Sequence, residues 1–433
     1  MKIRWTPPDF YEPSVAVTSE HHVDAKRMRL ALRLALRGYG TTSPNPMVGA
    51  VLVKSGKIIG RGWHRRAGGP HAEIEALRDA QKRGNNPKGA TLYVTLEPCC
   101  THGRTPPCTE AIKAAGIKRV VIGAVDPNPK HARRAFKILR RAGIEIVLPG
   151  SAGVPPASFS LHDRTTRRRG AGAPRTELAD ECARLNEAFN HWIVHRTPFV
   201  TVKAAMTLDG KIATASGESK WITGEKARAH GMKLRQGSDA ILVGINTILA
   251  DDPSLTFSSH SNSNENIEHP TSNAQHRKMR RIVLDSLART PLSAKVVSDE
   301  FAALTTIVVG KRAPKKRVAA LEKRVNVIVA PSANSKFKIQ NSKLDLLWLL
   351  KKLGTENVTS LLVEGGGEVN ASFLLGGFAQ RVAFFYAPKI LGGRDSRKAV
   401  AGEGVTRLTD ALELAEVEWQ RLELDLFLTA RLK

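Results

Sequence analysis

Two regular patterns of hydrophobic and polar positions cover most of the chain. Short apolar runs alternate with stretches in which apolar residues recur every three or four positions. The first pattern is typical of strands buried on both faces, and the second is typical of helices with one buried face. Strands that alternate with helices in this way predict a layered α/β architecture.

The first periodic region begins at Asp24, which is expected to cap the first helix, and that helix is expected to end at Gly38. Further along, the pattern predicts strands at 47–53, 57–63, 91–96, 119–125 and 144–148, and helices at 71–83, 108–115 and 130–142. We expect largely parallel pairing in the second half of this sheet, where strands and helices alternate.

A second periodic region begins near Glu177 and continues to the end of the chain. It predicts strands at 199–205, 240–244, 281–285, 306–310, 325–330 and 361–364, and helices at 225–235, 315–324, 344–353 and 368–375. The last apolar runs, 381–387 and 422–431, are expected to form antiparallel edge strands.

Two segments interrupt the periodicity. Residues 150–176 are rich in Gly, Pro, Ser and Arg and predict a linker, whereas residues 258–278 are rich in Ser, Asn and His and predict a surface insertion. A chain of 433 residues is long enough for two separate cores. We therefore expect an N-terminal extension at 1–23, a first domain at 24–149, a linker at 150–176 and a second domain at 177–433.

The composition narrows the range of partners. An excess of 67 basic over 40 acidic residues gives a net charge of +27, which favours phosphorylated ligands or polyanions. Aromatic residues make up only 5%, which leaves few platforms for base stacking and makes nucleic acid the less favoured partner. No apolar run is long enough to span a membrane. The four cysteines are too few for a disulfide framework, which favours a reducing, cytoplasmic setting, and we also expect a homo-oligomer.

Four residues form a motif with the chemistry of a catalytic zinc site. His71 and Glu73 open a predicted helix, Cys99 follows a predicted strand, and Cys108 opens the next helix. One imidazole and two thiolates suit Zn²⁺ and leave the fourth coordination position for water. Glu73 is not a ligand in this reading and could transfer the proton of that water. A His-x-Glu sequence followed by a Pro-Cys pair is the signature of zinc deaminases.

Each half of this motif also has a simpler interpretation. A His-Ala-Glu sequence arises often by chance, and Cys99 with Cys108 could be a structural zinc site or two buried thiols. Cys100 and His102 lie close enough to compete as ligands, but a closed four-ligand site would leave Glu73 no water to activate. We therefore exclude both from the metal site and interpret Cys182 as a buried thiol.

The second domain lacks the Gly-x-Gly-x-x-Gly fingerprint of a Rossmann dinucleotide site. Its best candidate for phosphate binding is the turn Gly365–Gly367, which joins an apolar strand to a helix. Such a turn presents backbone N–H groups and the positive end of a helix dipole to phosphate oxygens. A tight turn with no ligand fits these residues equally well.

Several separated segments together resemble the bifunctional deaminase/reductase family of bacterial riboflavin biosynthesis. In the first domain they are 44–49, 69–73 and 95–108, and in the second 203–211, 216–223, 244–253, 361–370 and 387–389. The eight residues between Cys99 and Cys108 favour this family over other deaminases, in which two residues between the cysteines are more common. The resemblance implies an N-terminal cytidine-deaminase-like α/β/α sandwich and a C-terminal dihydrofolate-reductase-like α/β domain.

The resemblance also implies roles for individual residues. Zinc is expected at His71, Cys99 and Cys108, with Glu73 as the proton carrier and Asn45 and His64 at the pyrimidine. Lys203 and Asp251 are expected nearest to the reduction chemistry. NADPH is expected at Ala205, Trp221, Thr247, Asp251, Ser286, Gly366, Gly367, Glu368, Val369, Asn370, Ala371 and Ser372, and the second substrate at Ser219, Arg235, Leu255 and Glu364.

The implied reactions are hydrolytic deamination of 2,5-diamino-6-ribosylamino-4(3H)-pyrimidinone 5′-phosphate and NADPH-dependent reduction of its ribosyl side chain to ribityl. One departure concerns Ser258, which stands where the family usually has a phosphate-binding arginine. Either another base such as Arg235 supplies that charge, or the reductase binds its substrate weakly. Two alternatives remain at this stage: a deaminase of tRNA or single-stranded DNA, and an RNA-binding regulatory protein with an inactive reductase half.

Overall fold

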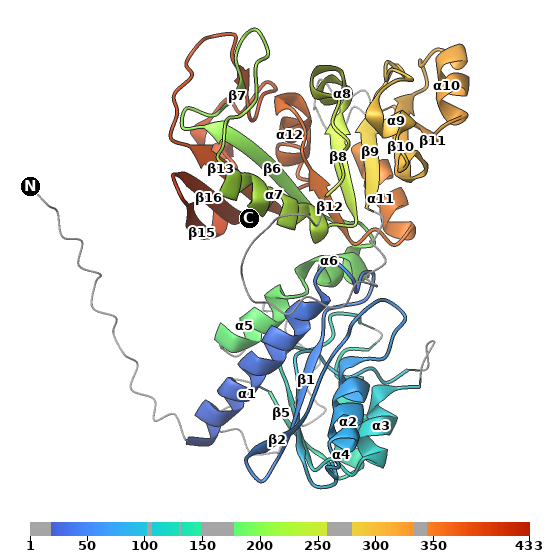
Figure 1. Cartoon of the computed structure of the whole chain (residues 1–433), viewed down its shortest axis with the longest axis vertical. Coiled ribbons are helices and arrows are strands. Elements are labelled where there is room, and N and C mark those ends of the chain that lie inside the picture. The colour runs from blue at the N-terminus through green and yellow to red at the C-terminus, as the bar shows by residue number, and fades with distance from the viewer. Residues whose placement is uncertain (1–18, 102–105, 130, 149–176, 258–278, 333–343) are drawn as a thin grey trace, which may run out of the picture.

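The computed structural model describes residues 19–101, 106–129, 131–148, 177–257, 279–332 and 344–433. These residues form two units, each built on its own large sheet, which lie one below the other in Figure 1. The predicted linker 150–176, the predicted insertion 258–278 and residues 1–18 of the N-terminal extension lie outside the described residues.

The first unit contains a five-stranded sheet in the order β2-β1-β3-β4-β5. Its strands are β1 (Gly49–Lys54), β2 (Lys57–Trp63), β3 (Thr91–Val94), β4 (Arg119–Ile122) and β5 (Glu145–Val147). β1 pairs antiparallel with both β2 and β3, whereas β3, β4 and β5 are parallel to one another. The expected parallel pairing in the second half of the sheet is thus confirmed.

Helices cover both faces of this sheet. The helices of this part of the chain are α1 (Ser19–Ala35), the short 3₁₀ helix η1 (Leu36–Gly38), α2 (Ala72–Lys82), α3 (Cys108–Ala114) and α4 (Arg134–Arg141). Alternate residues of β1 enter different cores: Val51 packs with Met28 of α1, and Leu52 packs with Ala76 of α2. The result is a three-layer α/β/α sandwich with a buried sheet, which explains why β1 is apolar at successive positions.

The next helix, α5 (Glu177–Arg184), belongs to the same layer as α1. Leu178 and Cys182 pack in one core with Met28 and Tyr93, and Cys182 is fully buried. The following helix, α6 (Glu187–His195), contacts strands of the second sheet instead. The packing therefore changes from one unit to the other near Asn186, although the hydrophobic pattern placed the start of the second domain at residue 177.

Asp24 lies inside α1 and does not cap it, so the expectation that the helix begins there was wrong. Its carboxylate accepts a hydrogen bond from Tyr93 Oη at 2.6 Å and pairs with Arg119 Nη2 at 2.7 Å. Because α1 packs flat against the sheet, the carboxylate meets side chains of β3 and β4. This long-range partnership takes the place of a local cap.

The second unit contains a nine-stranded sheet in the order β11-β10-β9-β8-β12-β6-β13-β16-β15. Its strands are β6 (Phe199–Thr207), β8 (Ala240–Gly244), β9 (Arg280–Leu284), β10 (Thr305–Gly310), β11 (Asn326–Ala330), β12 (Ser360–Val363), β13 (Arg381–Ala387), β15 (Leu414–Leu422) and β16 (Asp425–Leu432). All neighbours from β11 to β13 are parallel, and β16 and β15 then pair antiparallel.

Two expectations for this sheet are corrected. Residues 381–387 do not form an antiparallel edge: β13 lies inside the sheet, parallel to β6 on one side and antiparallel to β16 on the other. The run at 422–431 forms most of β16, and the edge is β15. The apolar pattern did not predict β15 because most of its side chains are exposed, so it carries no core-forming period.

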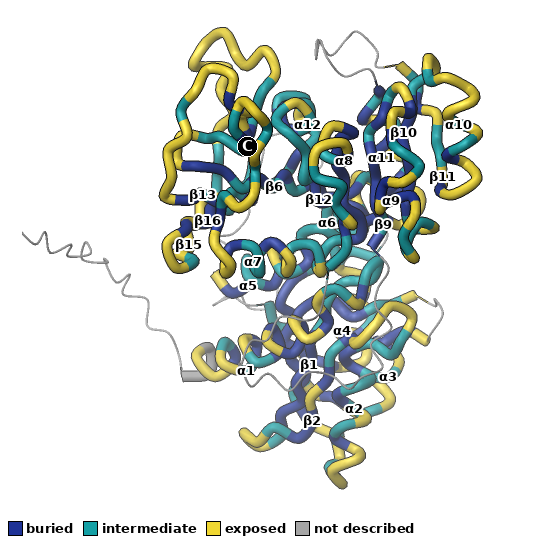
Figure 2. Tube along the Cα trace, turned by 45° about the horizontal axis from the view of Figure 1, so that its top comes forward, coloured by how far each residue is buried: buried dark blue, intermediate teal, exposed yellow. Residues whose placement is uncertain are grey.

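The remaining elements surround this sheet and form its rim. They are α7 (Glu225–Gln236), α8 (Ile245–Asp251), α9 (Lys295–Ser298), α10 (Lys315–Glu322), α11 (Leu346–Thr355), α12 (Gly367–Leu374), the two-stranded ladder of β7 (Lys211–Ala213) with β14 (Arg397–Lys398), and the 3₁₀ turns η2 (Ala302–Leu304) and η3 (Leu408–Asp410). Figure 2 shows buried strands inside each unit and exposed segments at the rims. Within the ranges described above, no helix combines the length and apolar character needed to cross a bilayer.

A glycine in β2 fixes the distance between α2 and the sheet. A Cβ atom at Gly62 would overlap the carbonyl oxygen of Ala72 and the amide nitrogen of Ala76. α2 therefore packs directly on the strand backbone, and the next subsection places two candidate site residues at the start of that helix.

We expect Gly62→Ala to lower the free energy of unfolding by about 1–3 kcal/mol, because α2 must move away from β2. Gly231→Ala is the matched control, since a Cβ at that position in α7 meets only Lys203 Cε, at an ordinary 3.8 Å. Alanine at this helical position should leave stability equal or slightly raised. Calorimetric melting of the full chain measures both changes, and an unchanged melting profile for Gly62→Ala would contradict the packing argument.

Candidate active sites

Three side chains from separate segments converge at one edge of the first sheet. His71 directly precedes α2, Cys99 follows β3, and Cys108 is the first residue of α3. The His71 Nδ1 atom lies 3.5 Å from Cys99 Sγ and 3.3 Å from Cys108 Sγ, and all three atoms lie within 4.8 Å of one another. In the described part of the chain, no other group of three or more His, Cys, Asp or Glu side chains has this geometry.

The chemistry of these donors fits zinc. The Cys108 amide donates to Cys99 Sγ at 3.2 Å. A hydrogen bond from the Cys108 thiol is the largest cause that lowers the pKa of Cys99 to about 4, and the same contact raises the pKa of Cys108. Two thiols compressed against one imidazole favour a cation that deprotonates both, and a thiolate-imidazole set is typical of Zn²⁺. Cys100 does not join this group, and His102 lies outside the described residues.

Glu73 lies in the first turn of α2 beside this cluster. Its side chain is buried, and burial raises the pKa of its carboxyl group, with the nearby Cys99 as a further cause. A buried carboxyl group with a raised pKa can hold a proton as well as release one. The structure therefore brings His71, Glu73, Cys99 and Cys108 together as the sequence predicted.

Asn45 and His64 meet next to the cluster. Asn45 Nδ2 lies 3.3 Å from His64 Nε2, while His64 Nδ1 lies 2.9 Å from the carbonyl oxygen of Pro70. Burial is the main cause that lowers the pKa of His64, so its ring is neutral, donating from Nδ1 and accepting at Nε2. The rings of His64 and His71 stand edge to face with centroids 5.4 Å apart. The two predicted pyrimidine contacts are thus adjacent to a predicted metal ligand.

The sequence assigned no role to Glu97, whose carboxylate binds backbone amides in the segment from β4 to the start of α4. Its buried carboxylate accepts hydrogen bonds from the amides of Asp126, Arg133 and Ala135 at 3.0–3.2 Å. These bonds tie the backbone after β4 to the backbone at the start of α4, and α4 begins at Arg134, later than the expected start at 130. The signal that could have identified Glu97 was its position as an acidic residue at the end of an apolar strand, directly before Pro98 and Cys99.

The second unit contains a cavity of about 1450 Å³, large enough for two ligands of ordinary size. Most of the residues expected at the cofactor or the second substrate line it: Lys203, Ala205, Ser219, Trp221, Arg235, Thr247, Asp251, Leu255, Glu364, Gly366, Gly367, Glu368 and Val369. Four expected cofactor residues do not line it: Ser286, Asn370, Ala371 and Ser372.

These four residues have other contacts. The Ser286 carbonyl oxygen accepts from the Gly310 amide, and Asn370 is buried and donates to the carbonyl oxygen of Ala399. Ala371 is buried, and the Ser372 hydroxyl donates to the carbonyl oxygen of Glu368. The three positions in α12 lie beyond the first turn of that helix.

A buried carboxylate pairs with two cations at the cavity wall. Arg235 donates from Nε and Nη2 to Glu364 at 2.8 and 2.9 Å, and Lys203 Nζ lies 3.5 Å from the same carboxylate. Burial alone would raise the pKa of Glu364, but Lys203 and Arg235 outweigh it and lower the pKa to about 2. The Glu364 carboxyl group is therefore ionised at neutral pH, and it fixes the position of both cations.

The glycine turn opens toward the cavity. Gly366 caps α12, and a Cβ at Gly366 would meet no other atom within 4 Å. Gly365, Gly366 and Gly367 all line the cavity wall. An open backbone cradle at the start of a helix, next to a basic cavity, fits the phosphates of a dinucleotide.

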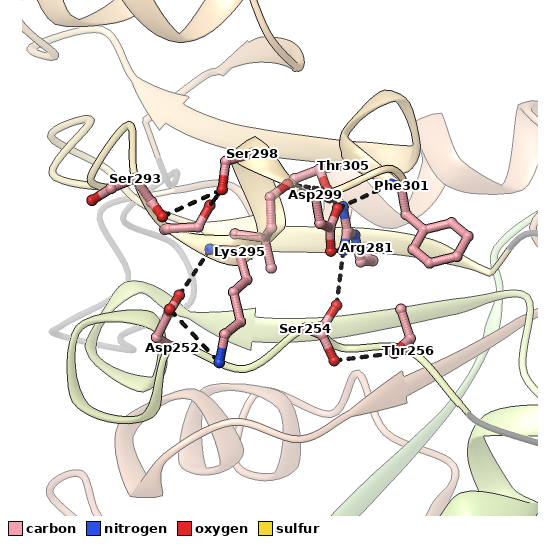
Figure 3. Close-up of polar contacts among 12 residues, drawn as sticks. Asp252, Ser254, Thr256, Arg281, Ser293, Lys295, Ser298, Asp299, Phe301 and Thr305 are labelled. Atoms are coloured by element: carbon pink, nitrogen blue, oxygen red, sulfur yellow. Dashed lines mark hydrogen bonds and ion pairs between the residues drawn. The ribbon is translucent and has the colours of Figure 1, made fainter. Parts of the chain in front are cut away.

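The loop after α8 forms another wall, and Arg281 of β9 anchors it from inside the protein (Figure 3). Arg281 is 1% exposed, and its Nη1 donates to the Ser254 carbonyl oxygen at 2.8 Å. All five N–H groups of the guanidinium find acceptors, which are Ser254, Val296, Asp299 and Thr305. Leu255, with φ of +53°, follows this anchored residue and lines the cavity.

Further basic side chains that the sequence did not single out line the same cavity. They are Lys220, Arg228, Lys295, Arg397 and Lys398. They come from four separate segments, so no local motif could have predicted their convergence. A cavity lined by this many bases is suited to phosphorylated ligands.

Comparisons with known proteins agree with the division of the chain into two units. Residues 21–124 match the family model for the cytidine and deoxycytidylate deaminase zinc-binding region, and residues 198–428 match the RibD C-terminal domain. The second match alone covers more than half of the chain.

Relatives extend over both units. The riboflavin biosynthesis protein RibD of Actinobacillus pleuropneumoniae is 40% identical over 391 residues, 90% of each chain, and that of Escherichia coli K12 is 37% identical over 90% of this chain and 94% of its own. The solved structure of Acinetobacter baumannii RibD, at 32% identity, has a TM-score of 0.73 and covers 96% of this chain and all of its own.

A Thermotoga maritima structure described as a diaminohydroxyphosphoribosylaminopyrimidine deaminase/5-amino-6-(5-phosphoribosylamino)uracil reductase has a TM-score of 0.71 at 31% identity and covers 96% of this chain and all of its own. The cytidine-deaminase-like and reductase folds expected from the sequence are thereby confirmed. This chain belongs to the RibD family of bifunctional riboflavin-biosynthesis enzymes, which joins a zinc-dependent deaminase to an NADPH-dependent reductase.

Proposed function

We propose that this chain deaminates 2,5-diamino-6-ribosylamino-4(3H)-pyrimidinone 5′-phosphate in its first unit and reduces the ribosyl group of the product in its second. The observation that carries the proposal is the convergence of His71, Cys99 and Cys108 beside the buried Glu73. The Thermotoga maritima structure, which this chain resembles over 96% of its length, is described by the same two activities in the same order.

In the first site, His71, Cys99 and Cys108 would hold zinc, which supplies a water molecule acidic enough to serve as the nucleophile near neutral pH. Glu73 takes up one proton of the attacking water and delivers it to the ring nitrogen, and it then carries the second proton of that water from the new hydroxyl group to the departing amine. Asn45 and His64 orient the pyrimidine, since their polar atoms lie 3.3 Å apart and the His64 ring stands against the His71 ring. The deamination consumes one water molecule and releases one ammonia molecule.

In the second site, bound NADPH would supply the hydride for reduction of the ring-opened ribosyl group at C1′. The open glycine cradle at Gly366 is suited to its phosphates, and Ala205, Trp221 and Thr247 line the same cavity. Lys203 is fixed by Glu364, so it can stabilise the electron pair that develops on the nitrogen bonded to C1′. Asp251 is the second polar candidate there, in contact with Ser219 Oγ at 3.3 Å.

The substrate phosphate needs a positive partner in place of the usual arginine at position 258, which lies outside the described residues. Arg235 is already engaged by Glu364 and by the carbonyl oxygen of Thr256. Arg228, Arg397 and Lys398 line the cavity, and none of them makes an ion pair with a described carboxylate. We infer that this group supplies the charge, and that the reductase site is complete.

The deaminase unit in this proposal comprises residues 24–149 together with α5, and the reductase unit begins at α6. The four cysteines are free of disulfides, in keeping with a proposed cytoplasmic setting where thiols remain available for zinc. A nucleic-acid deaminase and a regulatory RNA-binding protein are not favoured, because curated RibD relatives extend over both units.

We also propose a homo-oligomer that uses the β15 edge of the second sheet. Trp419 is 59% exposed and Leu424 is 75% exposed, and both lie on or beside β15. Val417 and Leu426 add exposed apolar surface at the same edge. Apolar side chains gathered at an uncovered sheet edge are typical of an interface with a second copy.

Glu73→Gln should reduce ammonia release by 10²–10⁴-fold, because the amide cannot carry the proton between water and amine. Zinc should remain at one per chain, since Glu73 is not a ligand in this proposal. Glu75→Gln is the control, because Glu75 lies in the same helix but pairs with Arg65 and Arg78. Full ammonia release by Glu73→Gln, or wild-type protein without stoichiometric zinc, would overturn the proposed function.

Glu364→Gln should abolish NADPH oxidation with the deaminated intermediate and lower stability at pH 7 by about 3–5 kcal/mol, because it leaves two partly buried cations without their counter-charge. The pKa of Glu364 is lowered to about 2, so its carboxylate stabilises the fold above its unfolded pKa, and this contribution is lost as pH falls toward 2. The stability difference from wild type should therefore shrink between pH 5 and pH 2 in denaturant titrations.

The exposed Glu322 of α10 provides the control, since Glu322→Gln should change neither quantity. A constant stability difference for Glu364→Gln across this pH range would show that the carboxylate is not held by the two cations.

Trp419→Lys combined with Leu424→Lys should shift the protein to a lower oligomeric state, because buried apolar contacts would be replaced by like charges. Sedimentation velocity at micromolar concentration measures the change. Val329→Lys is the matched control, because Val329 is 52% exposed on β11, the opposite edge of the same sheet. The edge assignment is wrong if Val329→Lys dissociates the protein and the double variant does not.

A further inference from the structure

One loop of the first unit contacts the second unit through its side chains and backbone. We define the bridging loop as residues 39–47, between η1 and β1. Tyr39 Oη donates to the carbonyl oxygen of Lys233 in α7 at 3.1 Å, and Ser43 Oγ donates to Asp239 Oδ2 at 2.8 Å. Asn45, a predicted pyrimidine contact of the deaminase site, lies within this loop.

Asp239 is a rigid anchor for Ser43. Asp239 is buried and directly precedes β8 in the chain. Its Oδ2 atom also accepts hydrogen bonds from the amide and hydroxyl of Thr359 at 2.6 and 2.7 Å and from the Ser360 amide at 3.1 Å. These partners lie at the start of β12, the neighbouring strand. The acceptor is therefore fixed by two adjacent parallel strands of the reductase sheet, independently of the bridging loop.

Asn186 holds the other end of the bridging loop. Its side chain accepts from the Met47 amide at 2.7 Å and donates to the Met47 carbonyl oxygen at 2.8 Å, so one amide group satisfies both backbone groups. Asn186 occupies the N-cap position of α6, yet its side chain makes no capping hydrogen bond. Asparagine is a preferred capping residue, and here its side chain serves the loop of the other unit instead.

The two anchors flank Asn45 on both sides along the chain. Asn45 Nδ2 in turn lies 3.3 Å from His64 Nε2, and the His64 ring stands against His71. The His64 amide also donates to the carbonyl oxygen of Val48, one residue beyond Met47. A continuous set of contacts therefore leads from β8, β12 and α6 of the second unit to the polar wall of the deaminase site.

We propose that Asp239 and Asn186 are positioning residues for deamination, through which the reductase unit holds Asn45 in the geometry that binds the pyrimidine. The proposal rests on the function proposed above, because it takes Asn45 as a pyrimidine contact. Substrate binding then requires no ordering of the bridging loop, since the second unit has already ordered it. The reductase unit thus contributes to the deaminase site without touching its substrate.

Asn186→Ala and Ser43→Ala test the proposal in the full chain. Each removes one anchor and leaves the zinc ligands, Glu73 and Asn45 unchanged. Asp239 is not substituted, because it also joins β8 to β12. We expect the KM for the diaminopyrimidine nucleotide to rise about tenfold in each single variant and further in the double variant, with kcat within threefold of wild type.

Two controls separate positioning from general destabilisation. Asn190→Ala removes a side chain one turn along α6 that donates to the carbonyl oxygen of Ala183 and not to the bridging loop. It should leave deaminase KM unchanged. Asn186→Asp keeps an acceptor for the Met47 amide but sets a carboxylate against the Met47 carbonyl oxygen, so its KM should rise at least as far as that of Asn186→Ala. NADPH oxidation should stay within twofold of wild type in every variant.

Wild-type deaminase KM in the Ser43→Ala/Asn186→Ala double variant would overturn the positioning role, as would an equal rise of KM in Asn190→Ala. A parallel loss of both activities would also overturn it, because positioning acts on the first site alone. These outcomes are distinct from failure of the proposed function, in which wild-type protein itself releases no ammonia from the nucleotide.

Discussion

The meeting of one imidazole and two thiols within 4.8 Å is the constraint on which the first unit depends. The three side chains come from the start of α2, the end of β3 and the start of α3, so all three elements must end or begin at one edge of the sheet. Gly62 allows α2 to lie directly on β2, and Glu97, two residues before Cys99, binds backbone amides between β4 and α4. With those positions set, the first turn of α2 carries Glu73 into a buried place beside the ligands.

The second unit relies on charge where the first relies on a metal. Its cavity gathers basic side chains from several segments around one largely buried carboxylate, Glu364. That carboxylate fixes Lys203 and Arg235, so the two nearest cations are ordered without a ligand. Arg281 plays a similar part behind the cavity wall, where its fully used guanidinium holds the loop that presents Leu255. Part of the basic excess behind the net charge of +27 thus lines this cavity, where it attracts phosphorylated ligands.

The two units are connected by more than a chain segment. The helix α5 follows the linker but completes the core of the first unit, whereas α6 packs on the sheet of the second. The bridging loop contacts α7, β8 and the residues at the start of β12 and α6. A fusion of two catalytic units can therefore do more than keep two activities together, because one unit can fix a binding loop of the other.

The sequence by itself determined the α/β class, most strands and helices, and the motif of His71, Glu73, Cys99 and Cys108 that the structure brings together. These features depend on local periodicity and on motif spacing, which neighbouring residues along the chain encode directly. The resemblance identified positions such as Ser286 and Asn370 but not how their side chains point, and neither lines the cavity.

Only the tertiary structure decided that Asp24 pairs with Arg119, that β13 is an inner strand, that Glu364 joins two cations, and that Asn186 binds Met47. Ser43 and Asp239 are 196 positions apart in the chain, and Asn186 and Met47 are 139 apart. No local pattern connects residues at such separations, because each residue gains its partner only when the complete sheets have formed and brought their edges together.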